Sequence, residues 1–136
     1  MDTLAYPPSF IPTFFDVVAA SAKDEPLVQL ENVVEFIGDD PDTHRQVFAL
    51  SRDLIEATLP ELREAMTKGD HPAVCRIAHR ARGSLGMLGV PHLQQMTMEI
   101  EYNRDELGLA HWRQRCQQLC EMLENLRKEL SGYLAA

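Results

Sequence analysis

Apolar residues recur every three or four positions along the chain after Pro26, which is the spacing of one buried face of an α-helix. The first such segment ends where Gly38-Asp39-Asp40-Pro41 stops one helix and begins another. Its apolar positions are Leu27, Leu30, Val33, Val34 and Ile37.

The second segment continues the pattern on Val47, Phe48, Leu50, Leu54, Ile55, Leu62, Ala65 and Met66. Pro60 lacks the amide hydrogen that a helix interior uses, so we expect it to kink the helix or to restart it near Thr58. A turn follows at Lys68-Gly69-Asp70, with Asp70 or His71 as the N-cap and Pro72 in the first helical turn.

Three further helices complete the pattern. The third is predicted from Pro72 to about Leu88, with Gly89 as its C-terminal cap, and the fourth from about Pro91 to Glu106. Gly108 separates the fourth from the last, which runs from Leu109 to about Tyr133. The apolar positions are Leu93, Met96 and Ile100 in the fourth helix, and Leu109, Trp112, Cys116, Leu119, Leu123, Leu126, Leu130 and Tyr133 in the last.

No segment alternates as a strand does, so the pattern predicts an all-α fold. We expect an antiparallel four-helix bundle over residues 24–136, with one or two additional short N-terminal helices. We expect residues 1–23 to form a proline-bearing arm whose apolar stretch, FIPTFFDVV, packs on the bundle; binding of a partner by this arm is the alternative.

Composition narrows the class of protein. The net charge of −8 argues against nucleic acid as a partner, because phosphate backbones attract a basic face. No apolar run approaches the ~20 residues of a membrane span, and the N-terminus lacks the positive start of a signal peptide. The three cysteines indicate no disulfide framework, and Cys116 and Cys120 are interpreted as small buried side chains. We therefore expect a cytoplasmic protein, and a monomer.

The stretch His79-Arg-Ala-Arg-Gly-Ser-Leu-Gly-Met-Leu-Gly89 carries the candidate chemistry. On a wheel of about 100° per residue, the apolar positions of the third helix fall within roughly 100° of arc, and His79 lies about 150° from its centre. The imidazole should therefore face solvent. The apolar positions are Val74, Ile77, Ala78, Ala81, Leu85 and Leu88.

Glycines and arginines surround His79 on the same wheel. Gly83 and Gly86 fall on either side of it, and Arg76 and Arg82 lie on the same exposed half. A glycine inside a helix costs roughly 1 kcal/mol relative to alanine, so two beside an exposed histidine indicate a surface that another protein approaches closely.

A neutral imidazole is a nucleophile, and phosphoryl transfer asks mainly for positioning and positive charge. Arg82, one turn from His79, could supply that charge, with Arg76 or Arg80 as weaker help. The sequence has no phosphate loop and no nucleotide fingerprint, so the phosphoryl group would arrive on another protein and this chain would need no cofactor.

The segment Ala78 to Gly89, followed by Leu93 and Ile100-Glu101, resembles the histidine-containing phosphotransfer (HPt) domain family. His79 matches the phosphorylated histidine of that family, while Gly83 and Gly89 match its two glycines. The sequence departs from the family pattern at Arg82, where lysine is usual, and at Ala81, where leucine is usual. Arginine keeps the charge as a planar fork, and alanine affects core packing and not the chemistry.

The resemblance implies a phosphorelay intermediate. His79 would take a phosphoryl group from a receiver-domain aspartate and give it to another, with an upstream hybrid sensor kinase as the source. The receiver would contribute Mg²⁺ and most of the catalytic groups. Gly83 and Gly86 would let its loops approach the imidazole, and Arg76 and Arg80 would meet its acidic pocket.

Two alternatives stay open. His71, Cys75 and His79 are spaced four residues apart and could be ligands of a metal ion, although the neighbouring arginines would repel a cation. Alternatively, the protein is an adaptor that binds a receiver without carrying phosphate.

Overall fold

The computed structural model of the chain describes residues 26–136, so the predicted arm over residues 1–23 lies outside the described residues. The described part is helical throughout and contains no strand. Its elements are α2 (Leu30–Ile37), α3 (Pro41–Thr67), α4 (His71–Ser84), the short 3₁₀ turn η1 (Gly86–Leu88), α5 (Pro91–Tyr102), α6 (Arg104–Leu107) and α7 (Leu109–Ala135).

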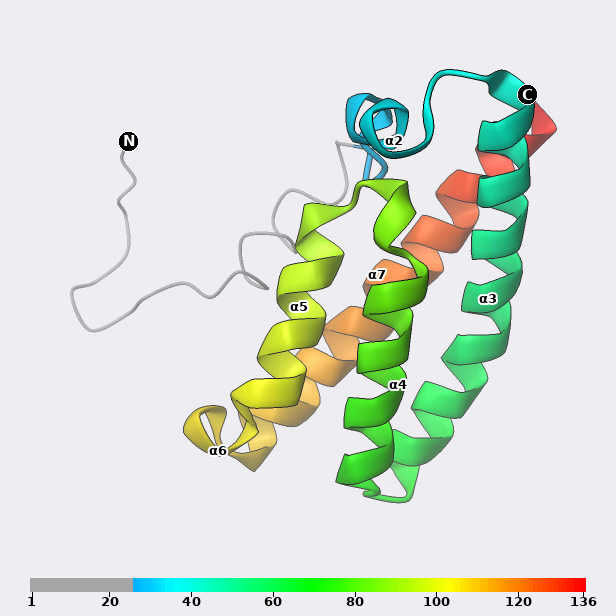
Figure 1. Ribbon diagram of the computed structural model, residues 1–136. Helices are drawn as coiled ribbons and strands as arrows, with labels where there is room; N and C mark the ends of the chain where they lie inside the picture. The colour runs from blue at the N-terminus through cyan, green and yellow to red at the C-terminus, as the bar shows by residue number, and fades with distance from the viewer. Residues whose placement is uncertain (1–25) are drawn as a thin grey trace, which may run out of the picture.

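The four long helices α3, α4, α5 and α7 run alternately up and down as an antiparallel bundle, and α2 lies across the end where α4 finishes and α5 begins (Figure 1). The all-α prediction is therefore confirmed. Helix α4 packs between α3 and α5, and α7 packs against both of those helices. The side chains of Trp112, Leu119, Leu123, Leu126 and Leu130 on α7 are fully buried at the centre. No helix between residues 26 and 136 is long and apolar enough to span a membrane.

Several predicted helix boundaries are wrong. Helix α3 continues from Pro41 to Thr67 through the exposed Pro60, so of the two expected effects, a kink or a new start near Thr58, the new start does not occur. The buried Leu59 and Leu62 on either side hold the helix against its neighbours, and this packing outweighs one lost hydrogen bond.

The third helix ends at Ser84 instead of Leu88, and the chain tightens into η1 before the left-handed Gly89. Two glycines within four residues lower the helix propensity of this turn, which favours the shorter 3₁₀ form. The predicted fourth helix is two helices, α5 and α6, separated at Asn103. Both changes lie at ends of helices, where local propensity and tertiary contacts compete.

Four predicted core positions are exposed, because the apolar pattern is wider than the face that each helix buries. These are Leu30, Val34, Leu50 and Leu109. Leu50 is the extreme case, with 70% of its surface accessible.

Gly89 does more than end a helix. Its φ of +63° lies in the left-handed region, and a Cβ placed there would lie 2.5 Å from Cβ of Asn32 and 3.1 Å from the carbonyl oxygen of Gln29. Helix α2 therefore rests directly on the backbone of Gly89. The missing side chain sets how closely α2 approaches the bundle.

We predict that Gly89→Ala lowers the free energy of unfolding by about 2 kcal/mol or more, because it adds both backbone strain and a clash with α2. Gly69→Ala is the matched control, since Gly69 has a φ of +66° but open space around its Cα. It should cost only the strain, about 1 kcal/mol. Urea unfolding measures both. Equal losses at the two positions would show that the contact with α2 contributes nothing.

Candidate functional site

Helix α4 buries one face and exposes the opposite one. Asp70 is its N-cap and accepts a hydrogen bond from the amide of Ala73 at 3.2 Å. The predicted core positions Val74, Ile77, Ala78 and Ala81 are buried against the neighbouring helices. The side chain of His79 is 64% exposed, as the wheel predicts.

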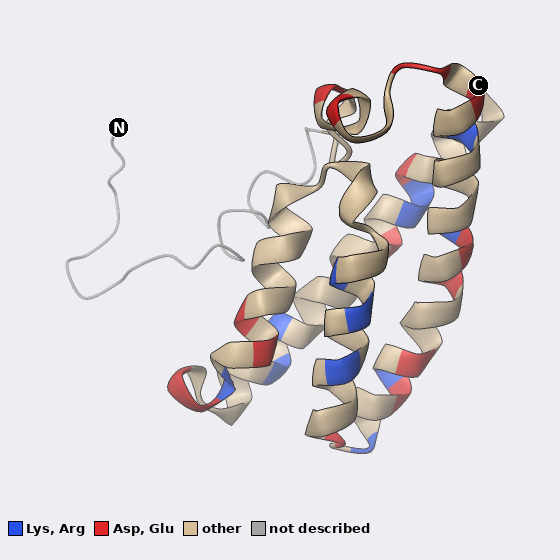
Figure 2. Cartoon of the chain, in the orientation of Figure 1, with Lys and Arg blue, Asp and Glu red and all other residues tan. Residues whose placement is uncertain are grey.

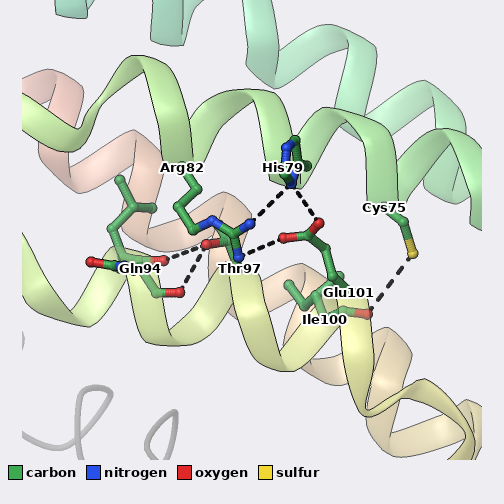
Figure 3. Close-up of polar contacts among 8 residues, drawn as sticks. Cys75, His79, Arg82, Gln94, Thr97, Ile100 and Glu101 are labelled. Carbon is green, nitrogen blue, oxygen red and sulfur yellow. Dashed lines mark hydrogen bonds and ion pairs between the residues drawn. The ribbon is translucent and has the colours of Figure 1, made fainter.

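His79 belongs to a three-residue cluster that joins α4 to α5 (Figure 3). Nδ1 of the imidazole lies 2.8 Å from Oε1 of Glu101, and Nη1 of Arg82 lies 2.8 Å from Oε2 of the same carboxylate. Nη2 of Arg82 also approaches Nδ1 of His79, at 2.9 Å. One carboxylate therefore holds both the imidazole and the guanidinium.

The position of Glu101 is fixed from the core. Its neighbour Ile100 is fully buried, and the carbonyl oxygen of Ile100 accepts a hydrogen bond from the indole Nε1–H of Trp112 at 2.9 Å. That carbonyl lies in the last turn of α5, where helix carbonyls lack an intrahelical donor. The indole thus ties this end of α5 to α7.

Glu101 belongs to the family resemblance but not to the predicted site residues, so its contact with His79 is a finding of the structure. The sequence does contain a signal for the position of Glu101. Ile100 is a predicted core position, and the next residue of a helix lies about 100° around its axis, at the edge facing a neighbouring helix.

The three arginines of α4 differ from one another in the structure. Arg82 was placed on the exposed half of the helix, but its side chain is only 17% exposed because it folds onto Glu101. Arg80 turns the other way and forms an ion pair with Glu61 of α3 at 2.8 Å. Arg76 is exposed.

The arginines of α4 form a row of basic side chains. The fourteen residues of α4 include three arginines and no acidic residue. Figure 2 shows these basic residues along α4, with acidic residues on the flanking helices. Arg80 and Arg82 are each paired with a glutamate of a flanking helix, so neighbouring carboxylates neutralise much of the positive charge of α4.

Gly83 and Gly86 border open space. A Cβ added at either position would meet nothing within 4 Å. Gly83 lies in the last turn of α4, but Gly86 begins η1, so it is not the mid-helix glycine that the sequence predicted. Neither glycine is needed for packing within the described chain.

The predicted metal ligands do not converge. Among residues 26–136, no group of three or more His, Cys, Asp and Glu side chains could hold a metal ion, and this rules against the His71, Cys75 and His79 set. The thiol of Cys75 points to the carbonyl oxygen of Ile100 at 3.9 Å, and burial raises its pKa. The ring of His71 packs edge-on against Trp112, with centroids 4.7 Å apart.

The cysteines of α7 are buried, as predicted. Desolvation raises the pKa of Cys116 to about 12, and it also raises the pKa of Cys120. Neither thiol is a nucleophile near neutral pH, because the thiolate is the reactive form.

Comparison with known proteins agrees with the geometry. The model of the Hpt domain family matches residues 46–129, which include His79, Arg82 and Glu101. Comparisons with curated proteins and with solved structures gave no match. Hpt domains carry out histidine phosphotransfer in phosphorelays, together with response-regulator receiver domains and kinases. Because the match covers more than half of the 136 residues, this chain belongs to the Hpt domain family.

Proposed function

We propose that this protein is a phosphorelay intermediate that carries a phosphoryl group on His79 between the aspartates of two receiver domains. The observation that supports it most is the exposed imidazole with Nδ1 in contact with a carboxylate. A hybrid sensor kinase is the upstream source in this proposal, and the protein acts as a monomer in the cytoplasm.

The contact with Glu101 selects the nucleophilic nitrogen. An ionised carboxylate only accepts hydrogen bonds, so the 2.8 Å distance to Nδ1 calls for a hydrogen on that atom. The lone pair of the neutral ring is then on Nε2. Nε2 is therefore the atom that attacks phosphorus.

The approach of Arg82 requires the opposite tautomer, because a guanidinium only donates and Nδ1 would have to accept. Only one of the two contacts is a hydrogen bond in a given tautomer. We assign it to Glu101, because Arg82 already has the other carboxylate oxygen as its partner and a bond from Nδ1–H to a carboxylate is charge-assisted.

The phosphoryl transfer needs only groups that the two proteins supply. The lone pair of Nε2 attacks the phosphorus of an aspartyl phosphate, the N–P bond forms, and the P–O bond to aspartate breaks. Aspartate leaves as a carboxylate. The phosphorylated ring keeps its hydrogen on Nδ1 and gains positive charge, which Glu101 stabilises. The receiver supplies Mg²⁺, and the reverse steps pass the group to a second receiver.

Arg82 is the basic group nearest the reacting ring. Its guanidinium lies 2.9 Å from Nδ1, on the side of the ring away from Nε2, so it adds positive charge beside the ring and does not touch a phosphoryl group on Nε2 in this conformation. Arg76 and Arg80 attract the anionic donor, and Gly83 and Gly86 leave room for its loops. These residues form the proposed binding surface.

We predict that Glu101→Ala shifts the neutral His79 ring from the Nδ1–H tautomer toward the Nε2–H tautomer, because the acceptor is lost and Arg82 can donate to Nδ1. Nitrogen-15 chemical shifts of the ring measure the two forms. Glu61→Ala, which removes the partner of Arg80 on the other flank, should leave them unchanged. A predominant Nε2–H ring in the wild type would refute the assignment of the nucleophile.

We also predict that a phosphorylated receiver with Mg²⁺ labels the protein with phosphate that is labile in acid and stable in base, as expected for a phosphoramidate bond. His79→Gln should abolish the label. His111→Gln, at an exposed histidine of α7, should retain it. Binding of receivers without any label would support the adaptor alternative instead, and labelling of His79→Gln would show that another residue is the acceptor.

The open space at Gly83 gives a test of the docking surface. Gly83→Leu should leave the protein folded, with an unfolding free energy equal to or up to about 1 kcal/mol above that of the wild type. Phosphoryl uptake from the receiver should slow at least about tenfold, because the added side chain occupies the approach to His79. Gly132→Leu on α7, which also projects into open space, is the matched control and should transfer normally. Unchanged uptake in Gly83→Leu would place the partner elsewhere.

A further inference from the structure

A pocket of about 150 Å³ lies beside the candidate site, where α2, η1 and the start of α5 meet. The buried side chains Leu85, Val90 and Leu93 contribute an apolar lining. Phe36, Arg82 and Gln94 are also among the residues that line it. The buried part of the lining is thus apolar, and the remaining lining residues include polar side chains.

Exposed apolar side chains gather around this pocket. Phe36 of α2 contributes to its wall and is 67% exposed. Met87, which follows the pocket residue Gly86, is 50% exposed. Large apolar side chains left in water next to a hollow are typical of protein interaction sites.

Arg82 connects the pocket to the site. Its side chain lines the pocket and contacts His79 at 2.9 Å. A protein interface of ordinary size covers about 800 Å² of each partner. A receiver that places an aspartyl phosphate on His79 therefore also covers the neighbouring pocket.

We propose that the pocket receives one apolar side chain of the docking receiver, and that this contact selects the partner. The proposal rests on the proposed function, because the receiver is the protein that must stand over His79. The arginines of α4 lie beside this face, and an aspartyl phosphate that reaches His79 would meet Arg82 and its partner Glu101 there.

The size of the pocket limits the side chain. A cavity of about 150 Å³ holds a benzene ring, so a leucine, methionine or phenylalanine side chain fits the space. Asn32 and Gln94 add polar groups to the lining, which can hydrogen-bond to the backbone of a docked segment. The protein would then distinguish one receiver from another by the shape and apolar character of a single receiver side chain. The phosphoryl chemistry at His79 would be the same for every receiver.

Two variants test the pocket from opposite directions. Phe36→Ala removes part of the wall, and Gln94→Trp fills the space from the exposed side of α5. The probe is the phosphorylated receiver domain that labels the wild type fastest, and initial transfer rates are measured against its concentration. Both variants should raise the half-saturating concentration about tenfold, while the rate at saturation stays within about twofold.

Matched controls separate the pocket from general effects. Val34→Ala lies on α2, about 160° around the helix from Phe36, and Leu50→Ala removes the most exposed leucine of α3. Both should leave the half-saturating concentration within about twofold. Phosphoramidate, which phosphorylates histidine without a partner protein, should label all four variants at the wild-type rate.

Several outcomes would overturn the proposal. Normal half-saturation in Phe36→Ala and Gln94→Trp, with receiver transfer intact, would refute the pocket and leave the proposed function standing. Failure of every receiver to label the wild type would instead refute the proposed function. Tighter receiver binding by the full chain carrying Phe14→Ser and Phe15→Ser would show that the chain's own N-terminal segment fills the pocket. Loss of a dimer in Phe36→Ala would show that a second copy does so.

Discussion

The rotation of α4 about its own axis is the constraint on which the site depends. Val74, Ala78 and Ala81 are almost completely buried, because α3 and α5 pack against α4 on either side. Turning the helix would bring Arg76 or Arg80 into the core, where an unpaired charge is very costly. The same hydrophobic burial that stabilises the bundle thus holds the imidazole of His79 toward solvent, without any contact made for that purpose.

The contact with Glu101 is the second constraint, and it acts on the orientation and the tautomer of the His79 ring. An exposed histidine alone would rotate freely and exchange its ring hydrogen between two nitrogens. The carboxylate reaches it from α5, and the bond from Trp112 to the Ile100 carbonyl ties that end of α5 to α7. Three helices therefore determine which ring nitrogen faces a partner. The imidazole is exposed, while Arg82 and Glu101, which contact it, are largely buried.

Local periodicity was sufficient to predict the orientation of His79, because a helix turns by a fixed angle per residue and the core face of α4 is unmistakable. The partners of Arg82 could not be derived in that way, since they depend on how α5 is placed beside α4. The helix ends at Ser84 and Asn103 differ from the predicted ones because the apolar pattern continues past both ends, while Gly83 and Gly86 lower the local helix propensity after Ala81. Pro60 shows the opposite case, in which packing on both sides preserves a helix that the local sequence would interrupt.

The position of Arg82 between the imidazole and the pocket has a thermodynamic consequence. If a side chain in the pocket changes the environment of this guanidinium, docking and the phosphorylation state of His79 share a coupling free energy. Linkage makes that coupling reciprocal: a partner that binds the phosphorylated form more tightly also stabilises the phosphorylated form by the same factor. In the proposed relay, such a coupling through Arg82 would let a receiver bind the phosphorylated and the unphosphorylated forms with different affinities.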